Sequence, residues 1–201
     1  MSMGIYPIID PPEHLRGHGK PEEWTDKFAR EHFDWFMSVR EERIKTLLMF
    51  FGVRRPNRDN ERSFLLGLGK TVAEQFFMEP NFREVLDKKE LTAPGLSMAH
   101  DMGLLVAELI IESAEGAVKW TLFKKTRRAL EYNLPVLIGR PPKMILDPVG
   151  GSLTEAKAML RRGMQSEIWG ETYSFWLERF TNETPMPAWR ILTEAAEKKI
   201  N

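Results

Sequence analysis

Apolar residues recur at three- and four-residue spacing through most of the chain, which is the spacing of one face of an α-helix. Prolines separate these stretches, because a proline inside a helix removes a hydrogen bond and clashes with the preceding turn. A short helix is also predicted from Asn81 to about Lys89, where Asn81 and Glu84 have the spacing of a capping pair. The longer predicted helices cover residues 22–51, 60–79, 97–134, 152–181 and 184–200.

The stretch from residue 97 to 134 is the least uniform of these predicted helices. Its centre, GLLVAELII, is apolar on nearly all sides, which indicates a buried helix. Gly116 is expected to bend or divide it. The alternation of Val118, Trp120 and Leu122 also fits a strand, and this alternative stays open. Residues 134–150 contain two short apolar triplets around a Gly-Arg-Pro-Pro sequence, so they are predicted to form a small hairpin or an ordered loop.

These patterns predict an all-α fold, an elongated multi-helix bundle with a short irregular or hairpin segment near residues 134–150. Residues 1–20 are rich in proline and glycine and have little means of forming a core, so we expect an extended N-terminal arm. Residues 21–201 are expected to form a single helical domain. A helix over residues 22–51 is about 45 Å long, which is close to the diameter of a compact domain of this size and favours an elongated shape.

Composition limits the classes of function. The chain of 201 residues has no cysteine, which excludes thiol catalysis and zinc–thiolate sites. Lys and Arg number 29 and Asp and Glu also number 29, so the net charge is zero and a general nucleic-acid or anionic-membrane binder is disfavoured. The first residues lack the pattern of a signal peptide, and no apolar stretch reaches the length of a membrane span. We therefore expect a cytoplasmic protein that does not enter a membrane.

Basic residues form two clusters. Four arginines fall within nine residues around Pro56, and guanidinium groups bind phosphates and carboxylates with two hydrogen bonds each, so this is the best candidate for partner or anion binding. Asp59 and Glu61 lie among them and could neutralise much of their charge. The second cluster fits the solvated face of a helix first and a phosphate-binding stripe second. The first cluster consists of Arg54, Arg55, Arg58 and Arg62, and the second of Lys124, Lys125, Arg127 and Arg128.

Two short motifs suggest phosphate or metal chemistry but fit it poorly. The sequence Gly-Leu-Gly-Lys-Thr at 67–71 resembles the end of a phosphate-binding loop, yet Phe64 stands where that loop needs its first glycine, and no strand precedes it. We predict helix there. His14 and His18, near Asp10, have a spacing that binds metal on a regular helix, which the neighbouring prolines and glycines disfavour. No metal and no cofactor are predicted.

Two further patterns lie on predicted helices. Glu108, Glu112 and Glu115 follow the buried run at helical spacing and form either an acid/base cluster or the end of a helix that emerges into solvent. Small residues recur every seven positions in the predicted helix 152–181, which indicates a close helix crossing, within the chain or between two copies of it. A homo-oligomer could use this face, which consists of Ala156, Gly163 and Gly170.

The leading functional hypothesis is a non-enzymatic interaction or adaptor protein that binds a macromolecular partner through the N-terminal arm and the arginine-rich loop. A protein partner is expected first, and nucleic acid second, through the local basic clusters. The alternative hypothesis is an enzyme or small-ligand-binding protein. Its pocket would be lined by Trp35, His32 and the three glutamates Glu108, Glu112 and Glu115. An enclosed pocket with convergent polar groups would favour the alternative, and a solid core the interaction protein.

Overall fold

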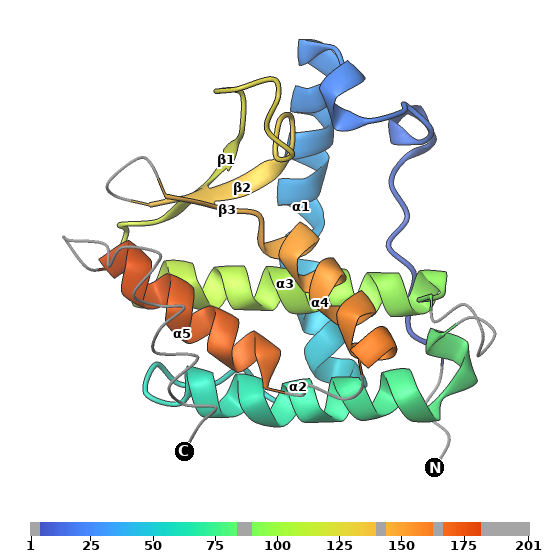
Figure 1. Cartoon of the computed structure of the whole chain (residues 1–201), viewed down its shortest axis with the longest axis vertical. Helices are drawn as coiled ribbons and strands as arrows, with labels where there is room; N and C mark the ends of the chain where they lie inside the picture. The colour runs from blue at the N-terminus through green and yellow to red at the C-terminus, as the bar shows by residue number, and fades with distance from the viewer. Residues whose placement is uncertain (1–4, 84–89, 140–143, 163–166, 182–201) are drawn as a thin grey trace.

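The structure is a computed structural model that describes residues 5–83, 90–139, 144–162 and 167–181. Within that part, five α-helices surround a core and a small antiparallel sheet lies to one side (Figure 1). The prediction of a helix-rich bundle is confirmed, and the prediction of a purely α fold is wrong because of the sheet. The elements are α1 (Asp26–Phe50), α2 (Glu61–Met78), α3 (Ala93–Ser113), β1 (Lys119–Leu122), β2 (Pro135–Ile138), β3 (Ile145–Leu146), α4 (Pro148–Arg162) and α5 (Ile168–Thr181), with short 3₁₀ helices at Glu13–Leu15, Pro21–Glu23 and Pro80–Phe82.

Helix α3 forms the centre of the molecule, with α2, α4 and α5 packed around it and α1 crossing behind it at a steep angle (Figure 1). Every residue from Asp101 to Ile110 is buried. The helix is long and apolar enough to cross a membrane, but 78% of its most apolar stretch is buried inside the molecule. This burial is typical of the core helix of a soluble protein. It also confirms the prediction that the apolar run is enclosed on most sides.

The first two long helices lie close to their predicted bounds. Helix α1 begins after Thr25, whose hydroxyl accepts a hydrogen bond from the Phe28 N–H at 3.2 Å, and it ends before Gly52, which has a left-handed φ of +62°. Helix α2 covers the whole Gly-Leu-Gly-Lys-Thr sequence at 67–71. The helical interpretation of that sequence is confirmed, and the backbone there does not have the loop form that wraps a phosphate.

The predicted helix over residues 97–134 is wrong beyond Ser113. Glu115 and Gly116 both have positive φ, +49° and +83°, so the chain leaves the helix there instead of bending it. The following residues form β1, in which Trp120 pairs with Leu137 of β2, and β2 also pairs with β3. The two alternatives left open from the sequence, a strand around Trp120 and a hairpin within residues 134–150, are therefore the correct ones.

The predicted helix over residues 152–181 is two helices, α4 and α5, and α4 begins one turn earlier than expected. Asp147 caps it by accepting a hydrogen bond from the Gly150 N–H at 2.8 Å, and Pro148 takes the first helical position. Ser152, where the predicted helix begins, is instead buried one turn inside α4. The helix predicted over residues 184–200, and all but the first residues of the one predicted from Asn81, lie outside the described residues.

Candidate functional site

The arginine cluster and the acidic cluster of the sequence meet in the structure. Arg55 forms an ion pair with Glu112 at 2.6 Å, and Arg58 forms one with Glu115 at 3.2 Å, so the loop after α1 is held against the end of α3. Among the described residues, neither Asp59 nor Glu61 forms an ion pair with the arginines of this cluster. Glu61 is buried, and it accepts a hydrogen bond from the Ser113 hydroxyl at 3.1 Å.

Glu108, the remaining member of the acidic cluster Glu108, Glu112 and Glu115, is buried and has different partners. Glu108 accepts a hydrogen bond from the Trp120 ring N–H at 2.7 Å and pairs with Arg40 at 2.9 Å. The three glutamates therefore have three separate basic partners along α3. In the described part of the chain no hydrogen bond or ion pair links them to His32 or Trp35.

His32 belongs to an aromatic cluster near the start of α1. Its ring centroid lies 4.8 Å from that of Trp24 and 5.5 Å from that of Trp35. Burial in this cluster lowers the pKa of His32, because the charged imidazolium is poorly solvated there, and the charge of His100 lowers it further. The shift therefore favours the neutral imidazole, and in the described part of the chain the buried Nδ1 of His32 has no hydrogen-bond partner.

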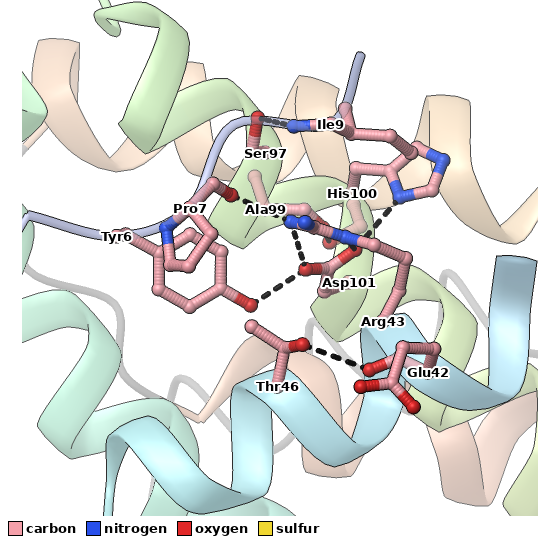
Figure 2. A network of polar contacts seen from close by, with 11 residues as sticks. Tyr6, Pro7, Ile9, Glu42, Arg43, Thr46, Ser97, Ala99, His100 and Asp101 are labelled. Carbon is pink, nitrogen blue, oxygen red and sulfur yellow. Dashed lines mark hydrogen bonds and ion pairs between the residues drawn. The ribbon is translucent and has the colours of Figure 1, made fainter. Parts of the chain in front are cut away.

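A buried polar network that the sequence did not indicate lies where the N-terminal segment crosses α1 and α3. Figure 2 shows the side chains of Tyr6, Arg43 and His100 pointing to Asp101, which is fully buried. The Tyr6 hydroxyl donates to Asp101 Oδ2 at 2.6 Å. Arg43 binds both carboxylate oxygens, at 3.1 and 2.6 Å, and His100 Nδ1 lies 3.0 Å from Oδ1. Asp101 thereby obtains the charge partner and hydrogen bonds that a buried carboxylate needs.

The same network fastens residues 5–9 to the body of the protein. Arg43 also donates to the Pro7 carbonyl oxygen at 2.8 Å, and the Ile9 N–H donates to the Ser97 hydroxyl at 2.9 Å (Figure 2). Burial is the larger cause, and the charge of Asp101 the next, of a pKa of the Tyr6 hydroxyl far above its usual range. The hydroxyl therefore stays protonated and donates its hydrogen bond to Asp101. A signal that could have indicated this network is Asp101, a carboxylate at the edge of an apolar helical run.

The two N-terminal histidines line a pocket to which Asp10, one of the carboxylates near them in the sequence, does not contribute. His14 and His18 line an open pocket of about 350 Å³ together with Trp24 and Phe28, whereas Asp10 pairs with Arg16 at 2.7 Å. Within the described residues, no group of three or more histidine, aspartate or glutamate side chains has the arrangement of a metal site.

The small residues of the predicted oligomer face pack inside the chain where the structure describes them. Ala156 is fully buried, and a Cβ on Gly170 would lie 2.7 Å from the Leu66 side chain, so α5 approaches α2 closely at this glycine. The pattern of small residues predicts a close helix crossing either within the chain or between two copies of it, and these contacts favour the crossing within the chain. Gly163 lies outside the described residues.

The second basic cluster lies on the loop between β1 and β2, residues 123–134, and not on a helix. Lys124 forms an ion pair with Asp26 at 2.7 Å, and this contact lowers the pKa of Asp26. The other three cations, Lys125, Arg127 and Arg128, are exposed, as is Leu130, which keeps 91% of its accessible surface.

Taken together, these contacts define a helix-rich protein with a small three-stranded sheet, a polar network that joins its N-terminal segment to the core, and an exposed basic loop. Comparison of the chain with protein-family models, with curated proteins and with solved structures finds no match.

Proposed function

We propose that this chain is a non-enzymatic interaction protein that binds an acidic macromolecular partner, a protein before a nucleic acid. The observation that carries the proposal is the β1–β2 loop, where Lys125, Arg127 and Arg128 are exposed beside Leu130. Glu131 is the one carboxylate in the sequence of this loop, so the loop is positive in a chain whose net charge is zero. Such a surface attracts carboxylates, and the leucine adds apolar contact.

The loop is held in one shape by hydrogen bonds on both sides of it. The Phe123 N–H donates to the Leu134 carbonyl oxygen and the Asn133 N–H to the Phe123 carbonyl oxygen, at 3.0 and 2.8 Å. The Asn133 side chain then donates to the Pro21 carbonyl oxygen at 2.6 Å. A loop that is already ordered loses less conformational entropy when it binds, which favours a role in recognition.

The N-terminal arm and the arginine cluster have smaller parts in this proposal. The short 3₁₀ helix that follows the arm supports the loop, because the carbonyl oxygens of Pro21 and Glu22 accept hydrogen bonds from Asn133 and Arg127. Arg55 is already paired with Glu112 of α3 and Arg58 with Glu115 just after α3, so Arg54 and Arg62, which are exposed, are the members of the arginine cluster left as secondary partner contacts.

The test is binding of the full chain to immobilised poly-L-glutamate at about 50 and about 200 mM salt. Reversing two loop charges, Arg127→Glu with Arg128→Glu, should weaken binding at least about tenfold, since like charges then face the probe. The matched control reverses two charges of the arginine cluster, Arg54→Glu with Arg62→Glu, and should weaken it less. Binding that ignores the loop variant, or that is absent in the wild type, contradicts the proposal.

A nucleic-acid partner gives a different result in the same experiment with labelled oligonucleotides. If the three loop cations contact phosphates, the slope of log affinity on log salt should be about −2.7 for duplex and about −2.1 for a single strand. Tight binding of that steepness, lost in the Arg127→Glu and Arg128→Glu variant, would reverse our order of the partner classes.

A further inference from the structure

A pocket of about 230 Å³ lies between α3, α4 and α5, at the end of β3. Two tryptophans of α5, Trp169 and Trp176, form one side of it, and Leu146 and Val106 contribute apolar surface from β3 and α3. Ser152, Glu155 and Thr172 supply the polar groups of the lining. The pocket is therefore apolar and aromatic with a few polar groups, which is the usual composition of a small-molecule site.

The walls of this pocket are held in place by contacts among its lining residues and with the backbone of α3. The Trp169 ring N–H donates to the Ser152 hydroxyl at 2.8 Å, and that hydroxyl donates to the Ala99 carbonyl oxygen at 2.6 Å, so the indole of a residue only 1% exposed is fixed between α4 and α3. Across the pocket, α3 and α4 meet at Gly103, where a Cβ would lie 2.5 Å from the Pro148 carbonyl oxygen. Both contacts keep the walls at a fixed separation.

Open space remains beside the backbone of α4. Gly151 lines the pocket, and a Cβ built on it meets no atom within 4 Å. A glycine inside a helix costs about 1 kcal/mol relative to alanine, and no close neighbour requires one at this position. Gly151 is exposed, so the open space beside it reaches solvent, and a side chain placed there would border the pocket.

From this geometry we infer that the pocket binds a small planar aromatic molecule of about the size of indole, independently of the β1–β2 loop. An apolar cavity of about 150 Å³ already accommodates benzene, whereas drug-sized ligands need about 300–1,000 Å³. The volume therefore fits a ligand of one or two rings. The half-buried Trp176 offers ring surface for stacking, and Thr172 offers a hydroxyl to a ring N–H of the ligand.

The experiment follows the ¹⁹F NMR signal of 5-fluoroindole as the full chain is added. A saturable shift is expected with the wild type. The variant Gly151→Leu places a side chain in the open space and should weaken binding at least about tenfold, which corresponds to about 1.4 kcal/mol. The matched control is Gly67→Leu, because Gly67 is also a helical glycine whose Cβ would meet nothing within 4 Å but is no part of the pocket. It should bind as the wild type does.

A second variant, Trp176→Ala, removes one aromatic wall and should also weaken binding, so the inference remains testable if Gly151→Leu fails to fold. Folding of every variant is checked by circular dichroism and thermal melting. A shift that does not saturate overturns the inference, and so does equal affinity of the wild type, Gly151→Leu and Trp176→Ala. Polyglutamate binding by the Gly151→Leu variant should be unchanged, which separates this inference from the proposed function.

Discussion

At the scale of the residue, the interior of this protein holds charged and polar groups that are bound to specific neighbours. Asp101 and Glu108 lie on the same buried helix, and each has an arginine of α1 as its partner, Arg43 and Arg40. Breaking a buried pair by removing one partner costs about 3–5 kcal/mol, because the other charge is left without compensation. His32 also lies in α1, but burial lowers its pKa and so favours its neutral form instead of a paired charge.

The neutral state of His32 predicts a pH dependence of stability. Burial lowers the pKa of this histidine in the folded protein, so below about pH 6.5, its ordinary pKa, the unfolded chain binds a proton that the native ring resists. The stabilisation that comes from keeping His32 neutral should therefore be complete above that pH. As the pH drops towards the folded pKa, the free energy of unfolding should fall by at most about 1.4 kcal/mol per pH unit for one proton.

The variant His32→Phe should reduce this loss, since it keeps the ring contacts with Trp24 and Trp35 and removes the titrating group. Urea denaturation at a series of pH values from about 7.5 to about 5 measures the effect. His14→Gln, at an exposed position, controls for the loss of one histidine. An unfolding free energy whose pH dependence is the same in His32→Phe and the wild type would contradict the prediction.

At the scale of the element, helix ends in this protein depend on single side chains. Asp147 combines two opposing effects at the start of α4: its carboxylate caps the helix through the Gly150 N–H, while burial raises its pKa and so disfavours the charge. The buried cap also explains why Gly150 is a glycine, because a Cβ there would lie 2.2 Å from Asp147 Oδ2.

We predict that Asp147→Ala destabilises the protein by about 0.5–2 kcal/mol through loss of the cap, whereas Asp147→Asn keeps the acceptor without the buried charge and stays within about 0.5 kcal/mol of the wild type. Urea denaturation at neutral pH measures both. Asp59→Ala, in an exposed loop, is the matched control and should change little. The prediction fails if the asparagine variant loses as much stability as the alanine variant.

An element could be predicted from the sequence when the residues that determine it lie close together along the chain. Proline and glycine placement and the helical period are local, so the bounds of α1 and α2 came within a few residues, and the Gly-Leu-Gly-Lys-Thr sequence was correctly predicted as helix. The strand containing Trp120 also fits a helical face, and only its partner Leu137, distant in the sequence, decides between them. No local pattern indicates which arginine reaches which glutamate, so Arg55–Glu112 was not predictable.

At the scale of the whole molecule, the N-terminal segment joins elements that the chain reaches much later. Tyr6 is fully buried, its ring meets Phe50 of α1 edge-on at 5.1 Å, and its hydroxyl bonds to Asp101, 95 residues away. Contacts of this range are formed only when α1 and α3 are already in place. Residues 5–9 should therefore stabilise the assembled core, which the expectation of an extended arm did not include.

This placement predicts a graded loss of stability when the segment is changed. A chain beginning at Asp10 loses the buried ring of Tyr6, a change of the kind that costs about 3–5 kcal/mol, out of about 5–15 kcal/mol for a whole domain. Tyr6→Phe keeps the ring and removes only the hydrogen bond to a charged group, so it should cost about 1.5–3 kcal/mol. Tyr132→Phe is the control, because its hydroxyl makes no hydrogen bond within the described part of the chain, and it should change the free energy of unfolding by less than about 0.5 kcal/mol.

Urea denaturation followed by circular dichroism and by tryptophan fluorescence distinguishes the possible results. If residues 5–9 belong to the core, both signals should shift together to lower urea in the order Tyr132→Phe, Tyr6→Phe, shortened chain, because a single cooperative unit unfolds. If the shortened chain is too unstable to fold, the comparison of Tyr6→Phe with Tyr132→Phe still gives the answer. Should the shortened chain unfold at the same urea concentration as the wild type, the segment would be free of the core in solution, and it would again be available to a partner.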